Sequence, residues 1–92
     1  MNVYMVTFQS AETTSTQYNI DEIKLFSNLD NAKAYAKTLL KRISEIFNIS
    51  EDKIKVSEKY YPEEEEFDIH ANFQHEDREW NSWAIVQKKE VE

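Results

Sequence analysis

The sequence contains no cysteine and no glycine, and Pro62 is its only proline. Without cysteine the chain cannot form disulfides, thiolate metal sites or a cysteine nucleophile. Loops that bind phosphate through bare backbone amides normally need glycine, so the usual nucleotide-binding fingerprints are excluded. Turns must therefore depend on Asn, Asp, Ser and Pro62.

Long apolar runs and a basic leader are also missing. No stretch approaches the roughly 20 apolar residues of a membrane span, and residues 1–10 contain no lysine or arginine, which argues against a secretory signal. We therefore expect a cytoplasmic protein without a membrane partner. A length of 92 residues suits one acidic domain, 1–92, with a single modest core.

The net charge of −7 is concentrated in one part of the chain. Residues 51–79 hold eleven acids and four bases, a difference that equals the whole net charge, while the remaining acids and bases cancel. The centre of this segment is the run Tyr60-Tyr61-Pro62-Glu63-Glu64-Glu65-Glu66. Such a localised negative field repels nucleic acid and attracts basic surfaces.

Apolar and alternating patterns predict the strands. The apolar run at 3–8 indicates a central strand covered on both faces, and the polar stretch at 9–22 is typical of a mobile loop. Shorter or alternating patterns predict further strands at 23–26, 53–61, 67–74 and 80–88.

The clearest periodic pattern predicts an amphipathic helix of about five turns. Its apolar positions, at spacings of three and four, are Leu29, Ala32, Ala36, Leu39, Leu40, Ile43 and Phe47. Ser27 resembles an N-cap with Asp30 at N3, and Asn48 can take the left-handed conformation that ends a helix. Three lysines at successive i+4 positions, beginning with Lys33, form a solvated face or one that meets acids.

Together these elements predict an α+β fold: a mostly antiparallel sheet of four to five strands, with one long amphipathic helix packed on one face. In the last strand Trp80, Ala84 and Val86 can point inward, which places Trp83 and Ile85 on the opposite face. Large apolar groups on both faces suggest that a helix or a partner chain covers the second face.

Catalytic and metal-binding interpretations find little support in the sequence. With eighteen acids, some pair always resembles a glycosidase pair, and the triplet Glu51-Asp52-Lys53, which resembles a nuclease metal site, falls in an expected turn. His70 and His75 match no familiar zinc spacing. We predict no enzyme activity, no catalytic residues, no bound metal and no cofactor.

Aromatic residues near the acids could form a platform on which bases stack. Single-strand binders, however, combine aromatics with a basic groove, whereas here Tyr60, Tyr61, Trp80 and Trp83 are interspersed with acids. Packing in the core or an interface is the better interpretation, and we expect no direct binding of nucleic acid.

The acids themselves permit two interpretations. One is a solvated edge that keeps the protein soluble and blocks edge-to-edge aggregation. The other depends on spacing, since same-face residues of a strand lie about 6.6 Å apart and phosphates on one DNA strand advance about 3.4 Å per residue. Acids on neighbouring strands could therefore imitate a DNA backbone, and a dimer would double the net charge of −7.

In its length, its lack of glycine and cysteine, its acidity and its Tyr60–Glu66 run, the chain resembles the Arn family, small antirestriction proteins of T-even bacteriophages. This resemblance implies a homodimeric DNA mimic that acts in the host cytoplasm. Its partner would be the McrBC restriction endonuclease, a DNA-binding protein that attacks modified cytosines in phage DNA. The family supplies no catalytic residues to transfer to this sequence.

The predicted partner-binding acids, which would stand in for phosphates, rest on charge and spacing. They are Glu51, Asp52, Glu63, Glu64, Glu65, Glu66, Asp68, Glu76, Asp77 and Glu79. The alternative is a generic acidic protein–protein interaction module that uses an apolar surface near Trp83 and Ile85, the same residues that could form a dimer interface.

Overall fold

The structure, a computed structural model, describes residues 1–14 and 19–91. Its strands are β1 (Asn2–Glu12), β2 (Asn19–Phe26), β3 (Lys55–Tyr61), β4 (Glu66–His75) and β5 (Arg78–Glu90). Its helices are α1 (Leu29–Ala36), α2 (Leu39–Phe47) and a single 3₁₀ turn, η1 (Glu51–Lys53).

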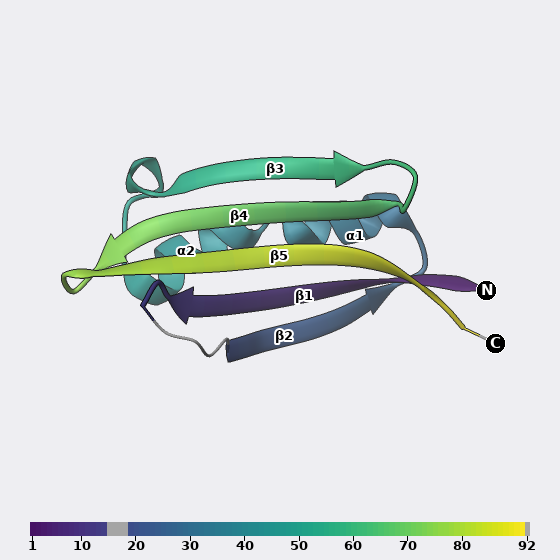
Figure 1. Cartoon of the computed structure of the whole chain (residues 1–92), viewed down its shortest axis with the longest axis horizontal. Coiled ribbons are helices and arrows are strands. Elements are labelled where there is room, and N and C mark those ends of the chain that lie inside the picture. The colour runs from purple at the N-terminus through teal and green to yellow at the C-terminus, as the bar shows by residue number, and fades with distance from the viewer. Residues whose placement is uncertain (15–18, 92) are drawn as a thin grey trace.

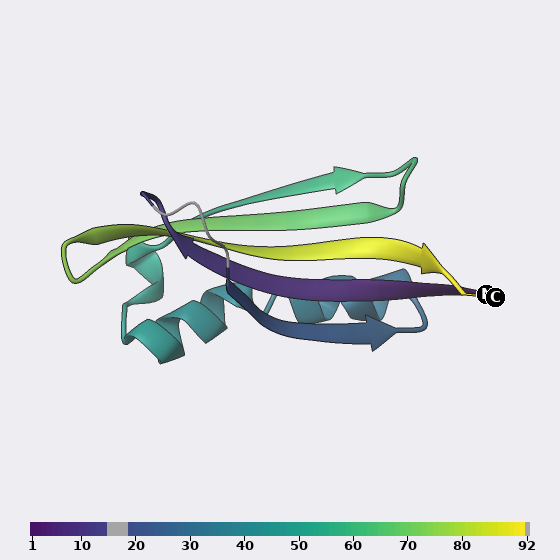
Figure 2. The same ribbon diagram turned by 60° about the horizontal axis from the view of Figure 1, so that its bottom comes forward.

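The five strands form one antiparallel sheet in the order β2-β1-β5-β4-β3, and both α-helices lie on one of its faces (Figures 1 and 2). The predicted α+β architecture with four to five antiparallel strands is confirmed. The chain ends meet at one end of the sheet, where the Met1 amino group donates to the Val91 carbonyl at 3.2 Å.

The prediction of a polar loop over 9–22 is wrong for most of its described residues. Strand β1 continues to Glu12 because it pairs with β5 along its whole length, from Asn2 opposite Glu90 to Glu12 opposite Trp80. Polar side chains such as Gln9 fit there, since an antiparallel strand can leave one face to solvent. The centre of the predicted loop, residues 15–18, lies outside the described residues.

The helical segment is bent, so the prediction of one long amphipathic helix is not confirmed. Helix α1 ends at Ala36 and α2 begins at Leu39. Between them the Thr38 amide donates to the Tyr35 carbonyl at 3.1 Å, and the Thr38 hydroxyl donates to the same oxygen at 2.7 Å. A threonine hydroxyl that competes for a backbone carbonyl is a known cause of helix bending.

The cap at the start of α1 also differs from the prediction. Asn28, not Ser27, is the N-cap, and its side chain accepts from the Asn31 amide at 2.8 Å. Both residue types cap well, so the sequence alone could not choose between them. At the other end Asn48 ends α2 in the left-handed conformation, with φ 55° and ψ 50°, as predicted.

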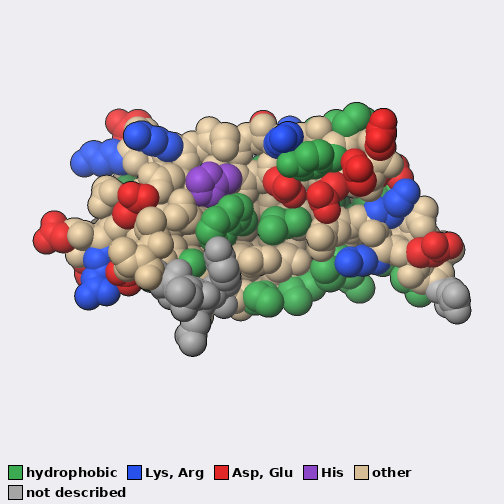
Figure 3. Space-filling view, viewed as in Figure 1, with side chains coloured by type: hydrophobic (Ala, Val, Ile, Leu, Met, Phe, Trp, Pro, Cys, Tyr) green, Lys and Arg blue, Asp and Glu red, His purple; other side chains and the backbone are tan. Residues whose placement is uncertain are grey.

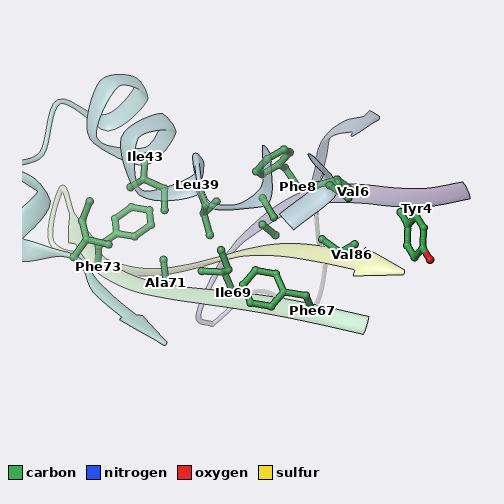
Figure 4. Close-up of a cluster of buried hydrophobic side chains, with 14 residues drawn as sticks. Tyr4, Val6, Phe8, Leu39, Ile43, Phe67, Ile69, Ala71, Phe73 and Val86 are labelled. Atoms are coloured by element: carbon green, nitrogen blue, oxygen red, sulfur yellow. The ribbon is translucent and has the colours of Figure 1, made fainter. Parts of the chain in front are cut away.

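The core lies between the helices and the sheet (Figure 4). The alternation predicted for β4 and β5 is confirmed, because the inward positions are buried except for Trp80, which is partly buried and packs against the core. From the sheet the core takes Tyr4, Val6, Phe8, Phe67, Ile69, Ala71, Phe73, Ala84 and Val86, and from the helices Ala32, Ala36, Leu39 and Ile43.

The opposite side of the sheet, here called the open face, is covered by neither α-helix (Figure 2). The expectation that β1 is covered on both faces is met only in part, because on the open face Thr7 and Ala11 are buried whereas Met5 and Gln9 are partly exposed. Trp83 and Ile85 lie on the open face as predicted, because Ala84 and Val86 between and beside them are fully buried on the other. No helix among residues 1–14 and 19–91 has the length and apolar character to cross a membrane.

Candidate functional site

Two acids of the Glu63–Glu66 run are exposed at the β3–β4 turn. Residues 62–65 connect Tyr61 at the end of β3 to Glu66 at the start of β4. Glu63 and Glu64 are exposed at the turn's tip, whereas Glu66 and Asp68 are half-buried on the open face. Figure 3 shows Asp and Glu side chains gathered at this end of the open face.

The open-face members of this group follow from strand geometry. Side chains two residues apart on a strand point to the same face, so Glu66 and Asp68 lie side by side while buried Phe67 points inward. We call Glu63, Glu64, Glu66 and Asp68 the acidic end. None of the four forms an ion pair within the described chain.

Asp68 is held in an unfavourable environment for a charge. Burial, and then the neighbouring charge of Glu66, raise the pKa of the Asp68 carboxyl, while Lys59 opposite it on β3 acts in the other direction. Its Oδ1 atom is buried and has no hydrogen-bond donor within the described residues. Unfavourable charge of this kind is more common at functional sites than elsewhere.

Glu65 differs from the other three glutamates of the run. Its side chain accepts from the Lys88 ammonium at 2.9 Å and from the Tyr4 hydroxyl at 3.2 Å. The hydrogen bond from Lys88 is the main reason that the pKa of Glu65 is lowered. The Glu65 carboxylate, which was predicted to stand in for a phosphate, is therefore already hydrogen-bonded within the protein. It lies on the side of the sheet where Tyr4 packs in the core.

The remaining predicted acids lie at the other end of the sheet. Glu76 and Asp77 form the β4–β5 turn, and η1 with Glu51 and Asp52 is at the same end (Figure 1). The ten residues of β4 separate this end from the acidic end, a distance of about 30 Å at 3.3 Å per residue. The ten predicted acids therefore form two groups and not one continuous surface.

At this second end acids and bases alternate (Figure 3). Arg78 pairs with Glu12 at 2.9 Å, and Glu79 accepts from the Thr13 hydroxyl at 3.1 Å and from the Asn72 amide at 3.2 Å. Neutralisation and internal hydrogen bonds leave less free negative charge here than at the acidic end.

An apolar strip runs beside the acids on the open face. Strand β2 exposes Ile20, Ile23 and Leu25, with 61%, 54% and 60% of their surfaces accessible. Ile85 is in register with Asp68 on one side and Thr7 on the other, and Thr7 is in turn opposite Ile23. The strip therefore reaches from the β2 edge to the acids.

The histidines and aromatics do not assemble into a common site. His70 stacks on Trp83 with 5.4 Å between ring centroids, while His75 contacts Phe47 of α2 on the other side of the sheet. Trp80 also contacts Phe47, so it lies away from Trp83. Among the residues that the structure describes, no cluster of three His, Asp or Glu side chains suits a metal ion.

Lys33 and Lys37 of the helical segment lie over aromatic rings, whereas exposed Lys41 pairs with Glu45 at 4.0 Å. The Lys33 ammonium lies 4.5 Å from the Tyr60 ring centroid and 5.2 Å from that of Phe67, and Lys37 also lies over Phe67. Contacts of this kind combine cation–π attraction with packing of the long side-chain stem. The solvated-face interpretation is therefore only part of their role.

A cavity of about 80 Å³ lies between α2 and the sheet. Apolar side chains including Phe8, Leu39 and Ile43 form much of its lining. Its two charged residues are already engaged, since Arg42 pairs with Glu22 at 2.9 Å and Asp21 accepts from the Ser10 hydroxyl at 3.2 Å. None of the predicted acids lines this cavity.

The contacts of Glu65 were not predicted from the sequence, although the alternation of inward side chains along β1 and β5 could have indicated them. Lys88 continues the inward alternation of Ala84 and Val86, and Tyr4 has the same relation to Val6. Their strands are adjacent, and Tyr4 and Lys88 are register partners.

Comparison with protein-family models finds no match for the chain, and neither the curated proteins nor the solved structures searched contain a match.

Proposed function

We propose that this protein is a non-enzymatic inhibitor that occupies the DNA-binding surface of a restriction endonuclease of the McrBC type and thereby protects phage DNA. The observation that carries the proposal is the acidic end: four acids, Glu63, Glu64, Glu66 and Asp68, lie together without an ion pair among the described residues. A groove built to bind phosphates with lysine and arginine would pair with such acids.

The spacing of the acids supports this choice of partner. Glu66 and Asp68 share a face at a separation of about 6.6 Å, twice the rise per residue of a strand. Successive phosphates of one DNA strand are about 3.4 Å apart along the axis. The two carboxylates therefore match every second phosphate, and the exposed turn extends the charge beyond them.

The energetics of Asp68 support the same interpretation. Burial and Glu66 both oppose its ionisation, so this charge does not contribute to folding in the isolated chain. A basic partner would supply the donor that Oδ1 lacks within the described residues. Charge maintained against the stability of the fold is characteristic of a residue used in binding.

We further propose that two copies associate and that they act in the host cytoplasm, where a restriction endonuclease meets incoming DNA. The exposed isoleucines and leucine of β2, together with half-buried Trp83 and Ile85, provide apolar surface for such association. A dimer would double the net charge of −7 and extend the negative surface.

A second candidate function is supported by that apolar strip. Ile20, Ile23 and Leu25 are each more than half exposed, and exposed apolar surface of this kind marks protein interaction sites. In this alternative the protein is a generic acidic interaction module, and its partner contacts the surface near Trp83 instead of the acids.

One experiment distinguishes the two candidates. Cleavage of methylated DNA by McrBC is measured at increasing concentrations of wild type, of Glu64→Lys/Glu66→Lys and of Trp83→Ala, each checked for folding by circular dichroism and for size by sedimentation. We expect the double reversal to weaken inhibition by tenfold or more, because like charges in an interface cost several kcal/mol.

The control Glu64→Gln/Glu66→Gln separates charge from size and should weaken inhibition less than the reversal. Full inhibition by a folded double reversal would show that the acidic end is not the contact. Loss of inhibition in Trp83→Ala alone, with size unchanged, would favour the interaction module.

A further inference from the structure

The turn that presents the acidic end has an unusual backbone. Glu65 adopts a left-handed conformation with φ 51°, and its amide donates to the Pro62 carbonyl at 3.4 Å. Glycine normally occupies such positions because a Cβ atom disfavours them. A glutamate in this conformation therefore needs interactions that offset the strain.

Those interactions come from two neighbouring strands. Glu65 precedes β4, Lys88 is on β5 next to β4, and Tyr4 is on β1 next to β5. Lys88 Nζ donates to Oε2 at 2.9 Å and the Tyr4 hydroxyl donates to Oε1 at 3.2 Å. Each carboxylate oxygen thus has a separate donor, and the turn is tied across three strands.

Of the two donors, Tyr4 is the buried one. Tyr4 is buried at the end of the core, beyond Val6 and Val86 (Figure 4). The side chains of Lys88 and Glu65 are 34% and 37% exposed, so water screens their pair only in part. The hydrogen bond and charge of Glu65 correspondingly raise the pKa of Lys88.

We propose that Glu65, Lys88 and Tyr4 form a clamp that fixes the β3–β4 turn and so positions Glu63, Glu64 and Glu66 for the partner. Glu65 is then a positioning residue and not a phosphate mimic. The consequence for binding rests on the proposed function, whereas the clamp itself can be measured without any partner.

The test uses Lys88→Met, which removes the ammonium and keeps much of the length of the side chain. Its matched control is Lys89→Met, which changes net charge equally at the neighbouring position; Lys89 is exposed and forms no ion pair among the described residues. We expect exchange of the Glu65 amide, which donates to the Pro62 carbonyl, to accelerate on the order of tenfold in Lys88→Met and to stay at the wild-type rate in Lys89→Met. Lys88→Arg should restore slow exchange.

Inhibition of DNA cleavage is a second measurement, for which charge attraction alone and the clamp predict different results. Both lysine replacements make the protein more negative, so charge attraction alone predicts equal or tighter binding for both. The clamp predicts that Lys88→Met inhibits about three- to tenfold less well than Lys89→Met, because a loose turn must be ordered on binding.

The outcomes separate the two proposals. Unchanged exchange of the Glu65 amide in Lys88→Met, or a Glu65 pKa within the ordinary glutamate range in an NMR titration of wild type, would overturn the clamp. Faster exchange with inhibition equal to that of Lys89→Met would overturn its role in positioning. If wild type itself fails to inhibit, the proposed function is wrong, while the exchange rates still decide the clamp.

Discussion

Asp68 combines three features that rarely occur together in a residue that stabilises the fold. It is half-buried, it lies beside Glu66, and its Oδ1 has no donor within the described residues. Buried polar atoms normally have a hydrogen-bond partner in the native state. Removing the charge should therefore favour folding and weaken binding, which are opposite effects of a single substitution.

The pH dependence of stability gives the first prediction at this scale. Since the pKa of Asp68 is raised in the folded state, the unfolded chain loses this proton first as the pH rises from about 3.8. Stability then falls until the folded-state pKa is passed, and the penalty is constant above it. Asp68→Asn should be more stable than wild type at pH 7, and the difference should disappear near pH 3.

Urea denaturation at pH 7 and pH 3 measures this difference. Asp52→Asn is the matched control because Asp52 is exposed on η1, and its effect should remain within about 0.5 kcal/mol. An Asp68→Asn protein no more stable than wild type at pH 7 would refute the expectation. So would a gain in stability that persists at pH 3.

At the residue scale, the sequence predicted which face of the sheet a side chain points to much better than which side chains interact. Alternation placed Phe67 and Ile69 inside and Trp83 outside, because a strand fixes the direction of each side chain. It could not assign different roles to Glu65 and Glu66, which are chemically identical neighbours. Their difference comes from the left-handed backbone at Glu65 and from Lys88 on another strand, neither of which is a local property.

The turns and helix ends show how the chain forms left-handed conformations without glycine. Such conformations occur at Asn48, Glu65, Glu76 and Asp77. The last two form the two-residue β4–β5 turn, in which positive φ at both positions suits the twist of a hairpin. The sequence suggested Asn and Asp for these positions, but it gave no reason to expect glutamate.

Asn48 provides a prediction for the helix end. It is exposed at the end of α2, and the Ile49 amide donates to the Ser44 carbonyl at 3.2 Å across it. Asn48→Ala should lower the free energy of unfolding by about 1 kcal/mol, because alanine disfavours the left-handed conformation. Asn48→Gly should be equal to wild type or more stable.

Thermal or urea unfolding of the two variants tests this expectation. Asn31→Ala is a control of opposite sign, since Asn31 is exposed within α1 and alanine is the better helix former there. Equal stability of the alanine and glycine variants at position 48 would show that the cap conformation does not limit the helix.

The bend in the helical segment marks the limit of periodicity as a guide. The predicted apolar positions Ala32, Ala36, Leu39 and Ile43 are all buried, so the inward face was right on both sides of the bend. The interruption arises from hydrogen bonds of Thr38 to the Tyr35 carbonyl. A helical wheel records which face is apolar and contains no information about such competition.

At the scale of the whole molecule, acids that are close in the sequence are not all close in space. The segment 51–79 carries the entire net charge, yet β4 spans the sheet and separates all of its acids except Glu58, which lies within β3, into two ends. The molecule is 46 Å along its longest axis, so a basic groove that engages one end need not contact the other. Variants that have equal net charge but differ in which end is altered can therefore show which end binds.

Two charge reversals of equal size address that question. Glu63→Lys/Glu64→Lys alters the acidic end and Glu51→Lys/Asp52→Lys alters the opposite end, and each changes the net charge from −7 to −3. All four residues are exposed and none has positive φ. Asp52 accepts a hydrogen bond from the Ser50 hydroxyl, so the folding of both variants is checked by circular dichroism. Long-range attraction is reduced equally in both.

We expect inhibition of DNA cleavage to fall on the order of tenfold or more for the acidic-end variant and less than about threefold for the other. The acidic-end variant should also show a weaker dependence of inhibition on salt, since fewer charges pair with the partner. Both are measured as inhibition constants between low and physiological salt. Equal losses would mean that net charge alone directs the association, and the assignment of the contact to the acidic end would then be wrong.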